Sequence, residues 1–203
     1  MAKPFPKHPN LQGGFAPLHM ECEAPDLVVE GEVPRELNGA FFRNGPNPQY
    51  APRGDYHWFG GDGMVHGFYL HDGKVDYRNR WVRTAKWNIE HEAGESLFGA
   101  FNPMDSDERV QGMKTDGLAN TNIVWHAGKL LALEEAHAPF QLDPTTLESV
   151  GPWTFDDKLV GPMTAHPKLD PETGEMLFFG YNADGMISDH MSFHVVVRDG
   201  KLV

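Results

Sequence analysis

Residues 64–83 read MVHGFYLHDGKVDYRNRWVR, and this stretch decides the fold class. The pair Asp72-Gly73 separates two runs that are rich in apolar and aromatic residues. An Asp-Gly pair in that setting is a strong signal of a β-hairpin, because a tight two-residue turn needs positive φ at its central positions. We therefore predict two antiparallel strands, over residues 64–70 and 75–83.

The same pattern recurs further along the chain. Residues 121–126 (TNIVWH) and 129–135 (KLLALEE) flank Ala127-Gly128, and residues 191–198 (MSFHVVVR) lead into Asp199-Gly200. Short strands are also expected over residues 27–31 and 39–43, and one short helix over residues 90–97 that ends at Phe98-Gly99. Hairpins without long intervening helices predict an all-β protein.

The pattern alone leaves the higher architecture open. The hairpin turns lie near residues 72, 127 and 199. This spacing gives roughly one four-stranded unit for each turn, which suits propeller blades of about 40–50 residues. No internal sequence repeat is visible, so a β-sandwich fits the pattern almost as well. The 22 glycines and 16 prolines are spread along the chain and agree with many turns in either fold.

Composition excludes several classes of protein. The 203 residues carry a formal net charge of -12, so a nucleic-acid backbone would be repelled and no nucleic-acid partner is expected. Cys22 is the only cysteine, which excludes an internal disulfide framework and a thiolate metal cage and fits a reducing, cytoplasmic setting. Three prolines among the first nine residues argue against a signal peptide, and no stretch approaches the roughly 20 apolar residues of a membrane-spanning helix.

Three segments carry the most specific signals. They are residues 42–48 (FRNGPNP), 56–66 (YHWFGGDGMVH) and 161–175 (GPMTAHPKLDPETGE). The last sets one imidazole, His166, before a turn rich in Pro, Asp and Gly. A neutral imidazole is a common ligand for iron, zinc or copper, although a lone His before a Pro is more often a solvated loop residue.

Taken in order and at these separations, the three segments resemble the carotenoid cleavage oxygenase family, and the resemblance covers essentially the whole chain. Members use non-haem iron and dioxygen to split carbon–carbon double bonds into two carbonyl products. The resemblance implies a seven-bladed β-propeller, of which residues 1–203 would form a single, incomplete domain: an extended arm over residues 1–25 and about three blades over residues 26–203. The propeller would then continue past Val203.

The resemblance also implies a metal site. His166 matches the first of four histidines that bind Fe(II) in the family, and the other three would lie beyond Val203. Along residues 129–135, Leu131, Leu133 and Glu135 share one face of the strand. A strand that is apolar on both faces is buried, so a carboxylate at its end needs a partner or must reach solvent. By resemblance, Glu135 would accept the Nδ1 hydrogen of an iron-bound histidine other than His166 and fix its orientation.

Substrate preference can also be inferred from the resemblance. Phe59 and Phe101 would line an apolar tunnel, or else belong to the core. Stilbene-cleaving relatives place a Tyr and a Lys near the positions of Phe101 and Glu134 to bind and deprotonate a phenol. Phe101 cannot donate a hydrogen bond and Glu134 would repel a phenolate, so we expect an apolar polyene or apocarotenoid, with lignostilbene-type cleavage as the runner-up. Because carotenoids reside in membranes, a peripheral membrane contact is expected.

The remaining candidates receive structural interpretations. Asn44 and Asp62 are expected to cap or bridge backbone groups, and His66 to be a structural histidine. His190 and His194 are expected on a strand, where i, i+4 residues lie about 13 Å apart, so they are rejected as a metal pair. No catalytic acid–base residue is predicted. Two alternatives to an iron-dependent dioxygenase stay open: a propeller that only binds ligands, and an inactive fragment.

Overall fold

A computed structural model describes residues 3–100, 102–185 and 188–203 of the chain. The strands are β1 (Cys22–Ala24), β2 (Gly39–Pro46), β3 (Gly63–His71), β4 (Lys74–Trp81), β5 (Asn122–His126), β6 (Lys129–Leu133), β7 (Phe140–Leu142), β8 (Ser149–Pro152), β9 (Lys168–Leu169), β10 (Met176–Gly180) and β11 (Ser192–Val196). Within the described residues the only α-helix is α1 (Ala85–Ala93), and the short 3-10 helices are η1 (Pro9–Leu11), η2 (Gly13–Phe15), η3 (Trp58–Gly60), η4 (Pro103–Asp105) and η5 (Glu108–Val110).

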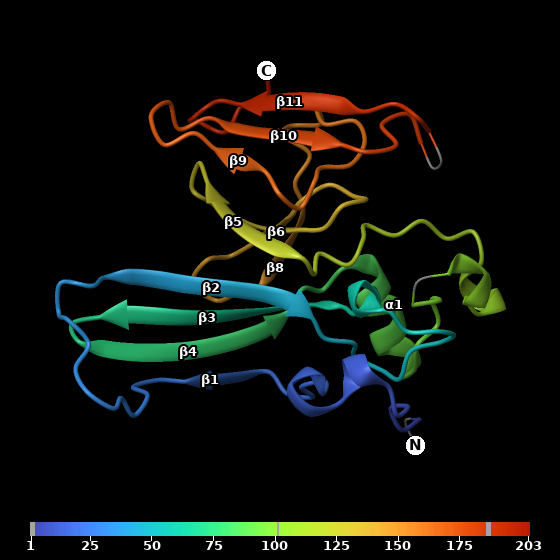
Figure 1. Cartoon of the computed structure of the whole chain (residues 1–203), viewed down its shortest axis with the longest axis horizontal. Helices are drawn as coiled ribbons and strands as arrows, with labels where there is room; N and C mark the ends of the chain where they lie inside the picture. Colours follow the sequence, from blue (N-terminus) through green and yellow to red (C-terminus); the bar gives the residue numbers. More distant parts are fainter. Residues whose placement is uncertain (1–2, 101, 186–187) are drawn as a thin grey trace.

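The strands form three antiparallel sheets, and Figure 1 shows them following one another in chain order from blue to red. The strand orders are β1-β4-β3-β2, β5-β6-β7-β8 and β11-β10-β9. Edge strands β2 and β5 of two neighbouring sheets contact each other. The prediction of an all-β chain built from consecutive small sheets is therefore confirmed.

The predicted hairpins form with the predicted turns. In the β3–β4 hairpin His71 pairs with Lys74, which leaves Asp72 and Gly73 as a two-residue turn with φ of 43° and 78°. The β5–β6 hairpin repeats this arrangement, with Ala127 and Gly128 at φ of 48° and 76°. Positive φ at both positions matches the right-handed twist of the flanking strands.

The core lies between the sheets and is centred on β6. Leu131 and Leu133 pack toward the third sheet in one cluster, while Leu130 and Ala132 pack toward the first sheet in another. All four side chains are buried. The expectation that this strand is apolar on both faces and buried is therefore confirmed, and the candidate residues Glu134 and Glu135 follow its last residue directly.

Two predicted elements are wrong. Residues 27–31 form no strand: Val28 is fully exposed, and Leu27 makes a single backbone hydrogen bond, to Val75.

The N-terminal arm is not merely extended, because it contains η1, η2 and β1, and β1 pairs with β4 to complete the first sheet. The side chain of Asn79 holds β1 in place by accepting from the Cys22 amide at 2.8 Å.

The helix lies closer to the N-terminus than predicted. The Thr84 hydroxyl accepts from the Trp87 amide and caps its start, and Gly94, at φ 70°, ends it. The carboxylate of Glu90 accepts the amides of Leu97 and Phe98 at 2.8 and 2.9 Å. A left-handed glycine commonly ends a helix, so residues 95–97 form a turn around the Glu90 side chain and do not continue α1.

Candidate metal-ligand region around His166

Hydrogen bonds hold both the carbonyl and the amide of the peptide group between Ala165 and His166. The Ala165 carbonyl accepts from the Asn122 side chain at 2.7 Å, and the His166 amide donates to the Thr164 hydroxyl at 3.1 Å. Both Thr164 and Ala165 are fully buried. The following Pro167 further restricts the conformation of His166, because a residue before proline is biased to extended backbone. The imidazole itself is 63% exposed, so the backbone and not side-chain packing sets its position.

Glu135 lies beside His166 in this chain. Its Oε1 atom is 3.2 Å from His166 Nε2. The expectation that Glu135 serves a histidine other than His166 therefore differs from the contact seen here. The difference arises because Glu135 comes just after β6 and His166 just before β9, which brings the two residues together across neighbouring sheets. The other oxygen, Oε2, is buried and lacks a hydrogen-bond partner among the described residues, so it is free to accept a second donor.

The side chains of this region could supply one part of a metal site but not a complete one. Among residues 3–100, 102–185 and 188–203, no group of three or more His, Cys, Asp or Glu side chains could hold a metal ion. His166 is exposed, is fixed through its backbone and lies next to a carboxylate with an unpaired buried oxygen. These properties suit one ligand of a site whose other ligands come from outside the described residues.

Glu134 forms a pair that the sequence analysis did not foresee. Its carboxylate accepts a short hydrogen bond from Nδ1 of His137. That bond raises the pKa of His137 above its ordinary value, against the opposing effect of partial burial, and the charges of Glu134 and Asp116 add to the rise. Glu134 was expected to repel a phenolate as an isolated carboxylate, whereas its carboxylate is hydrogen-bonded to His137. The Glu-x-x-His spacing was the one available signal.

The predicted tunnel residues are only partly described. Phe59 lies in η3, is 57% exposed and stacks edge-on against His57 with ring centroids 5.0 Å apart. Phe101 lies outside the described residues. Glu134 is mostly buried. Phe59 does not line the cavity described below, so the tunnel stays a prediction.

The other motif residues have structural contacts. Asn44 donates to the carbonyls of Ala119 and Asn122, at 2.8 and 2.9 Å, as the bridging prediction requires. Asp62 accepts from the Gln49 amide at 3.0 Å. His66 bonds to the Tyr77 hydroxyl at 2.7 Å. His194 lies on β11 and stacks on Phe178, while His190 precedes the strand.

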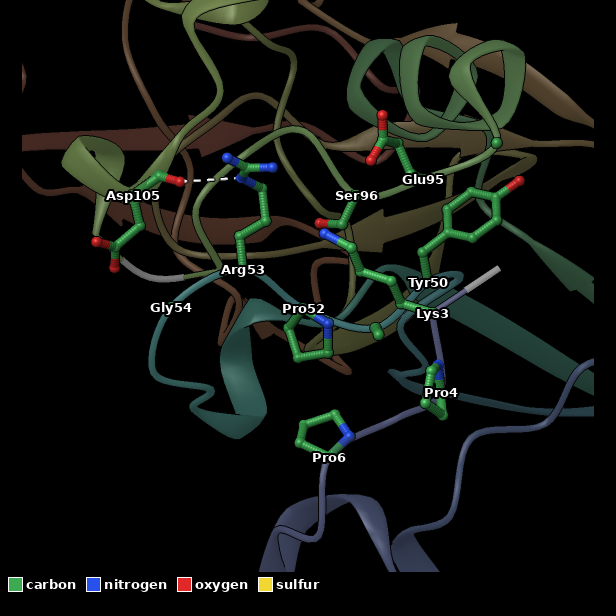
Figure 2. A pocket seen from close by; sticks show the side chains of 12 residues that line it. Lys3, Pro4, Pro6, Tyr50, Pro52, Arg53, Gly54, Glu95, Ser96 and Asp105 are labelled. Carbon is green, nitrogen blue, oxygen red and sulfur yellow. Dashed lines mark hydrogen bonds between the residues drawn. The ribbon is translucent and has the colours of Figure 1, made fainter. Parts of the chain in front are cut away.

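A separate cavity of about 450 Å³ lies under the N-terminal arm (Figure 2). It is lined by Lys3, Pro4, Pro6, Tyr50, Ala51, Pro52, Arg53, Gly54, Gly94, Glu95, Ser96 and Asp105. Figure 2 shows the Arg53 side chain turned toward Asp105, whose carbonyl accepts from Arg53 Nε at 3.1 Å. None of the predicted site residues lines this cavity, so it is distinct from the region around His166.

Consecutive antiparallel sheets around a buried central strand define part of a β-propeller, and a histidine whose backbone is held by hydrogen bonds lies just before the first strand of the third sheet. The chain belongs to the retinal pigment epithelial membrane protein (RPE65) family, whose sequence model matches residues 15–203. The resemblance to carotenoid cleavage oxygenases stated above is thereby confirmed.

Relatives in this family are named as oxygenases. The chain is 45% identical over 202 residues to lignostilbene-alpha,beta-dioxygenase isozyme III of Sphingomonas paucimobilis, covering 98% of this chain and 41% of that protein. It is 42% identical over 204 residues to isoeugenol monooxygenase of Pseudomonas nitroreducens, covering 100% of this chain and 42% of that protein. It is 38% identical over 211 residues to a carotenoid 9,10(9',10')-cleavage dioxygenase of Phaseolus vulgaris, covering 95% and 38%.

Solved structures agree with the fold. The crystal structure of Pseudomonas brassicacearum lignostilbene dioxygenase matches with a TM-score of 0.93 and 39% identity, covering 100% of this chain and 42% of that one. Cobalt-substituted apocarotenoid oxygenase of Synechocystis matches with a TM-score of 0.78 and 28% identity, covering 92% and 42%. The propeller prediction is therefore confirmed, and the chain spans about two fifths of the length of the relatives it matches.

Proposed function

We propose that the whole protein is an iron(II)-dependent oxygenase that cleaves a conjugated carbon–carbon double bond with dioxygen. The observation that carries the proposal is the backbone-fixed, exposed imidazole of His166 in a chain of the oxygenase family. The cobalt-substituted relative supports a metal in the proposal, because a matched structure is described as holding cobalt.

The chain's own residues have limited roles in this proposal. His166 would be one ligand, and Glu135, whose Oε2 atom is buried and unpaired, would orient an imidazole through a carboxylate hydrogen bond. When bound, iron would supply the site at which dioxygen is activated. Glu135 Oε1 now lies next to His166 Nε2, so binding a metal at Nε2 would require the carboxylate to turn toward another donor.

For the substrate we favour an alkene conjugated to an aromatic ring. The relatives named for lignostilbene and isoeugenol are 45% and 42% identical, against 41% and 38% for two relatives named for carotenoid cleavage. The lignostilbene dioxygenase structure also matches with the TM-score of 0.93, against 0.78 for the apocarotenoid oxygenase. This reverses the order in which the sequence analysis placed the two substrate classes.

An apolar polyene or apocarotenoid is the second candidate. Phe101 in place of a tyrosine and Glu134 in place of a lysine still leave the chain without the phenol-activating pair of stilbene-cleaving relatives. No helix among the described residues is long and apolar enough to cross a membrane. A peripheral membrane contact, which a carotenoid substrate would favour, belongs to this second candidate.

The test uses the complete protein and its His166→Ala variant, with His71→Ala as the matched control because His71 is exposed at the β3–β4 turn. We expect wild type and His71→Ala to hold stoichiometric iron and to release aldehyde products from isoeugenol or a hydroxystilbene faster than from an apocarotenoid. His166→Ala should lose both iron and cleavage. Undiminished iron in His166→Ala would contradict the metal assignment, and a faster apocarotenoid reaction would move the second candidate ahead.

A further inference from the structure

Two side chains hold the peptide group between Ala165 and His166, and one of them, Asn122, comes from another sheet. The carbonyl of this peptide group accepts from Asn122 Nδ2 at 2.7 Å, and its amide donates to Thr164 Oγ1 at 3.1 Å. Asn122 is the first residue of β5 in the second sheet, whereas Ala165 leads into β9 of the third. The bond therefore joins two sheets at the position of His166.

Asn122 is itself held from both sides. Its Oδ1 atom accepts from the Ile123 amide at 2.8 Å, which fixes the amide group so that Nδ2 faces Ala165. Its own carbonyl accepts from Asn44 Nδ2 at 2.9 Å, and the same nitrogen donates to the Ala119 carbonyl. Asn44 lies on β2 in the first sheet. Hydrogen bonds thus run from β2, through the start of β5, to the residue before His166.

We infer that Asn122 is a positioning residue for His166 and that Asn44 secures Asn122 in that role. The inference rests on the proposed function, in which His166 binds a metal. Most of the imidazole is exposed, so packing of neighbouring side chains contributes little to its position, and the contact with Glu135 is the side-chain contact described for it. Restraint of the peptide group fixes the Cα atom from which the imidazole extends, and so narrows the positions that the ring can reach, in the way that outer contacts orient other metal ligands.

The structural part of the inference is testable without metal. Amide hydrogen exchange at His166 is measured in the complete apo protein for wild type, Asn122→Ala and Thr164→Val. We expect exchange at His166 to accelerate about threefold to tenfold in each variant, because each removes one hydrogen bond from the same peptide group. Unchanged exchange in Asn122→Ala would overturn the inference, whatever Thr164→Val or the metal does.

Asn120→Ala is the matched control. Asn120 precedes the same strand, is buried, and donates to the carbonyls of Phe59 and Gly61 at 2.7 and 2.6 Å, so its loss also removes bridging bonds. Its side-chain hydrogen bonds within the described residues go to Phe59, Gly61 and Thr121 and not to residues 164–166. It should lower the melting temperature at least as much as Asn122→Ala while leaving exchange at His166 unchanged. If Asn120→Ala accelerates exchange at His166 as much as Asn122→Ala does, the effect reflects a general loss of stability and the inference is overturned.

The metal part uses Co(II) as the probe, with affinity measured by chelator competition on the complete protein. We expect Asn122→Ala to weaken Co(II) binding about tenfold, as loss of an outer contact typically does, and Asn120→Ala to stay within about twofold. If His166→Ala loses Co(II) but Asn122→Ala binds as wild type, the positioning role is wrong and the proposed function stands. If His166→Ala binds Co(II) as wild type, the metal assignment of His166 fails, and the inference that depends on it fails too.

Discussion

At the scale of single residues, the structure shows the Glu134–His137 pair beside the candidate site. The hydrogen bond between them raises the pKa of His137, with burial opposing and the charges of Glu134 and Asp116 assisting. Glu134 directly follows β6 and His137 comes two positions after Glu135, so the pair flanks Glu135 in the sequence.

The raised pKa has a defined consequence for stability. The unfolded-state pKa of histidine is about 6.5, and the folded-state pKa lies above it. The stabilisation from the protonated pair is therefore fully present below about pH 6.5 and is lost as the pH rises through the folded-state pKa. We expect NMR titration of His137 to give a lower pKa in Glu134→Gln than in wild type. Asp116→Asn should lower it less, because Asp116 acts only through its charge. An unchanged His137 pKa in Glu134→Gln would show that the pair does not form.

At the scale of elements, α1 is fixed to the loop before β3 by a buried group of three charges, Lys86, Asp62 and Glu90. Lys86 Nζ lies 2.8 Å from Asp62 Oδ1 and 2.7 Å from Glu90 Oε2. Burial opposes the charge on Lys86, yet the two carboxylates outweigh it and hold the pKa of Lys86 above its ordinary value. The remaining carboxylate oxygens accept backbone amides from residues 49, 97 and 98. The group therefore fixes the glycine-rich segment of residues 60–63 against the helix.

Replacing Lys86 by methionine should destabilise the protein by about 3–5 kcal/mol, because it leaves two buried carboxylates without a counter-charge. Lys74→Met is the control: Lys74 pairs with Asp26 at 3.1 Å, but both side chains are more than half exposed, so the loss should stay within about 1 kcal/mol. Urea unfolding of the complete protein measures both. Glu90→Gln added to Lys86→Met should recover part of the loss. Equal costs for the two lysine variants would refute a buried ionic role.

The sequence predicted the elements whose causes are local. Asp72-Gly73 and Ala127-Gly128 specify their turns through positive φ, so those hairpins were predictable from short stretches. Strands β7 and β9, of three and two residues, are too short to show a recognisable sequence pattern. Asn122 could not be recognised, because its partner Ala165 is far away in the chain and the bond depends on how two sheets meet. The same reason hid the contact between Glu135 and His166.

At the scale of the whole molecule, the third sheet is apolar on both faces. Met176, Phe178 and Val196 are buried against the second sheet. On the opposite face Leu177 and Phe193 are 44% and 77% exposed. A sheet face with such residues is ordinarily covered by another layer, because layers pack through their apolar faces. In a propeller that layer is the neighbouring blade, and we expect the complete protein to place one here.

This expectation separates the behaviour of the 203 residues alone from that of the complete protein. Expressed alone, residues 1–203 should associate through the uncovered face, since a contiguous apolar patch favours self-association. Replacing Leu177 and Phe193 by serine should make the isolated segment more soluble and shift it toward monomer in analytical ultracentrifugation. The same pair of changes should destabilise the complete protein, by about 1.5–3 kcal/mol for each side chain that a blade fully buries.

Val28→Ser with Met104→Ser is the control, because these side chains are 99% and 83% exposed but belong to no shared sheet face. That pair should change neither solubility nor stability appreciably. If the complete protein carrying Leu177→Ser and Phe193→Ser is as stable as wild type, this face stays uncovered and the next blade packs elsewhere.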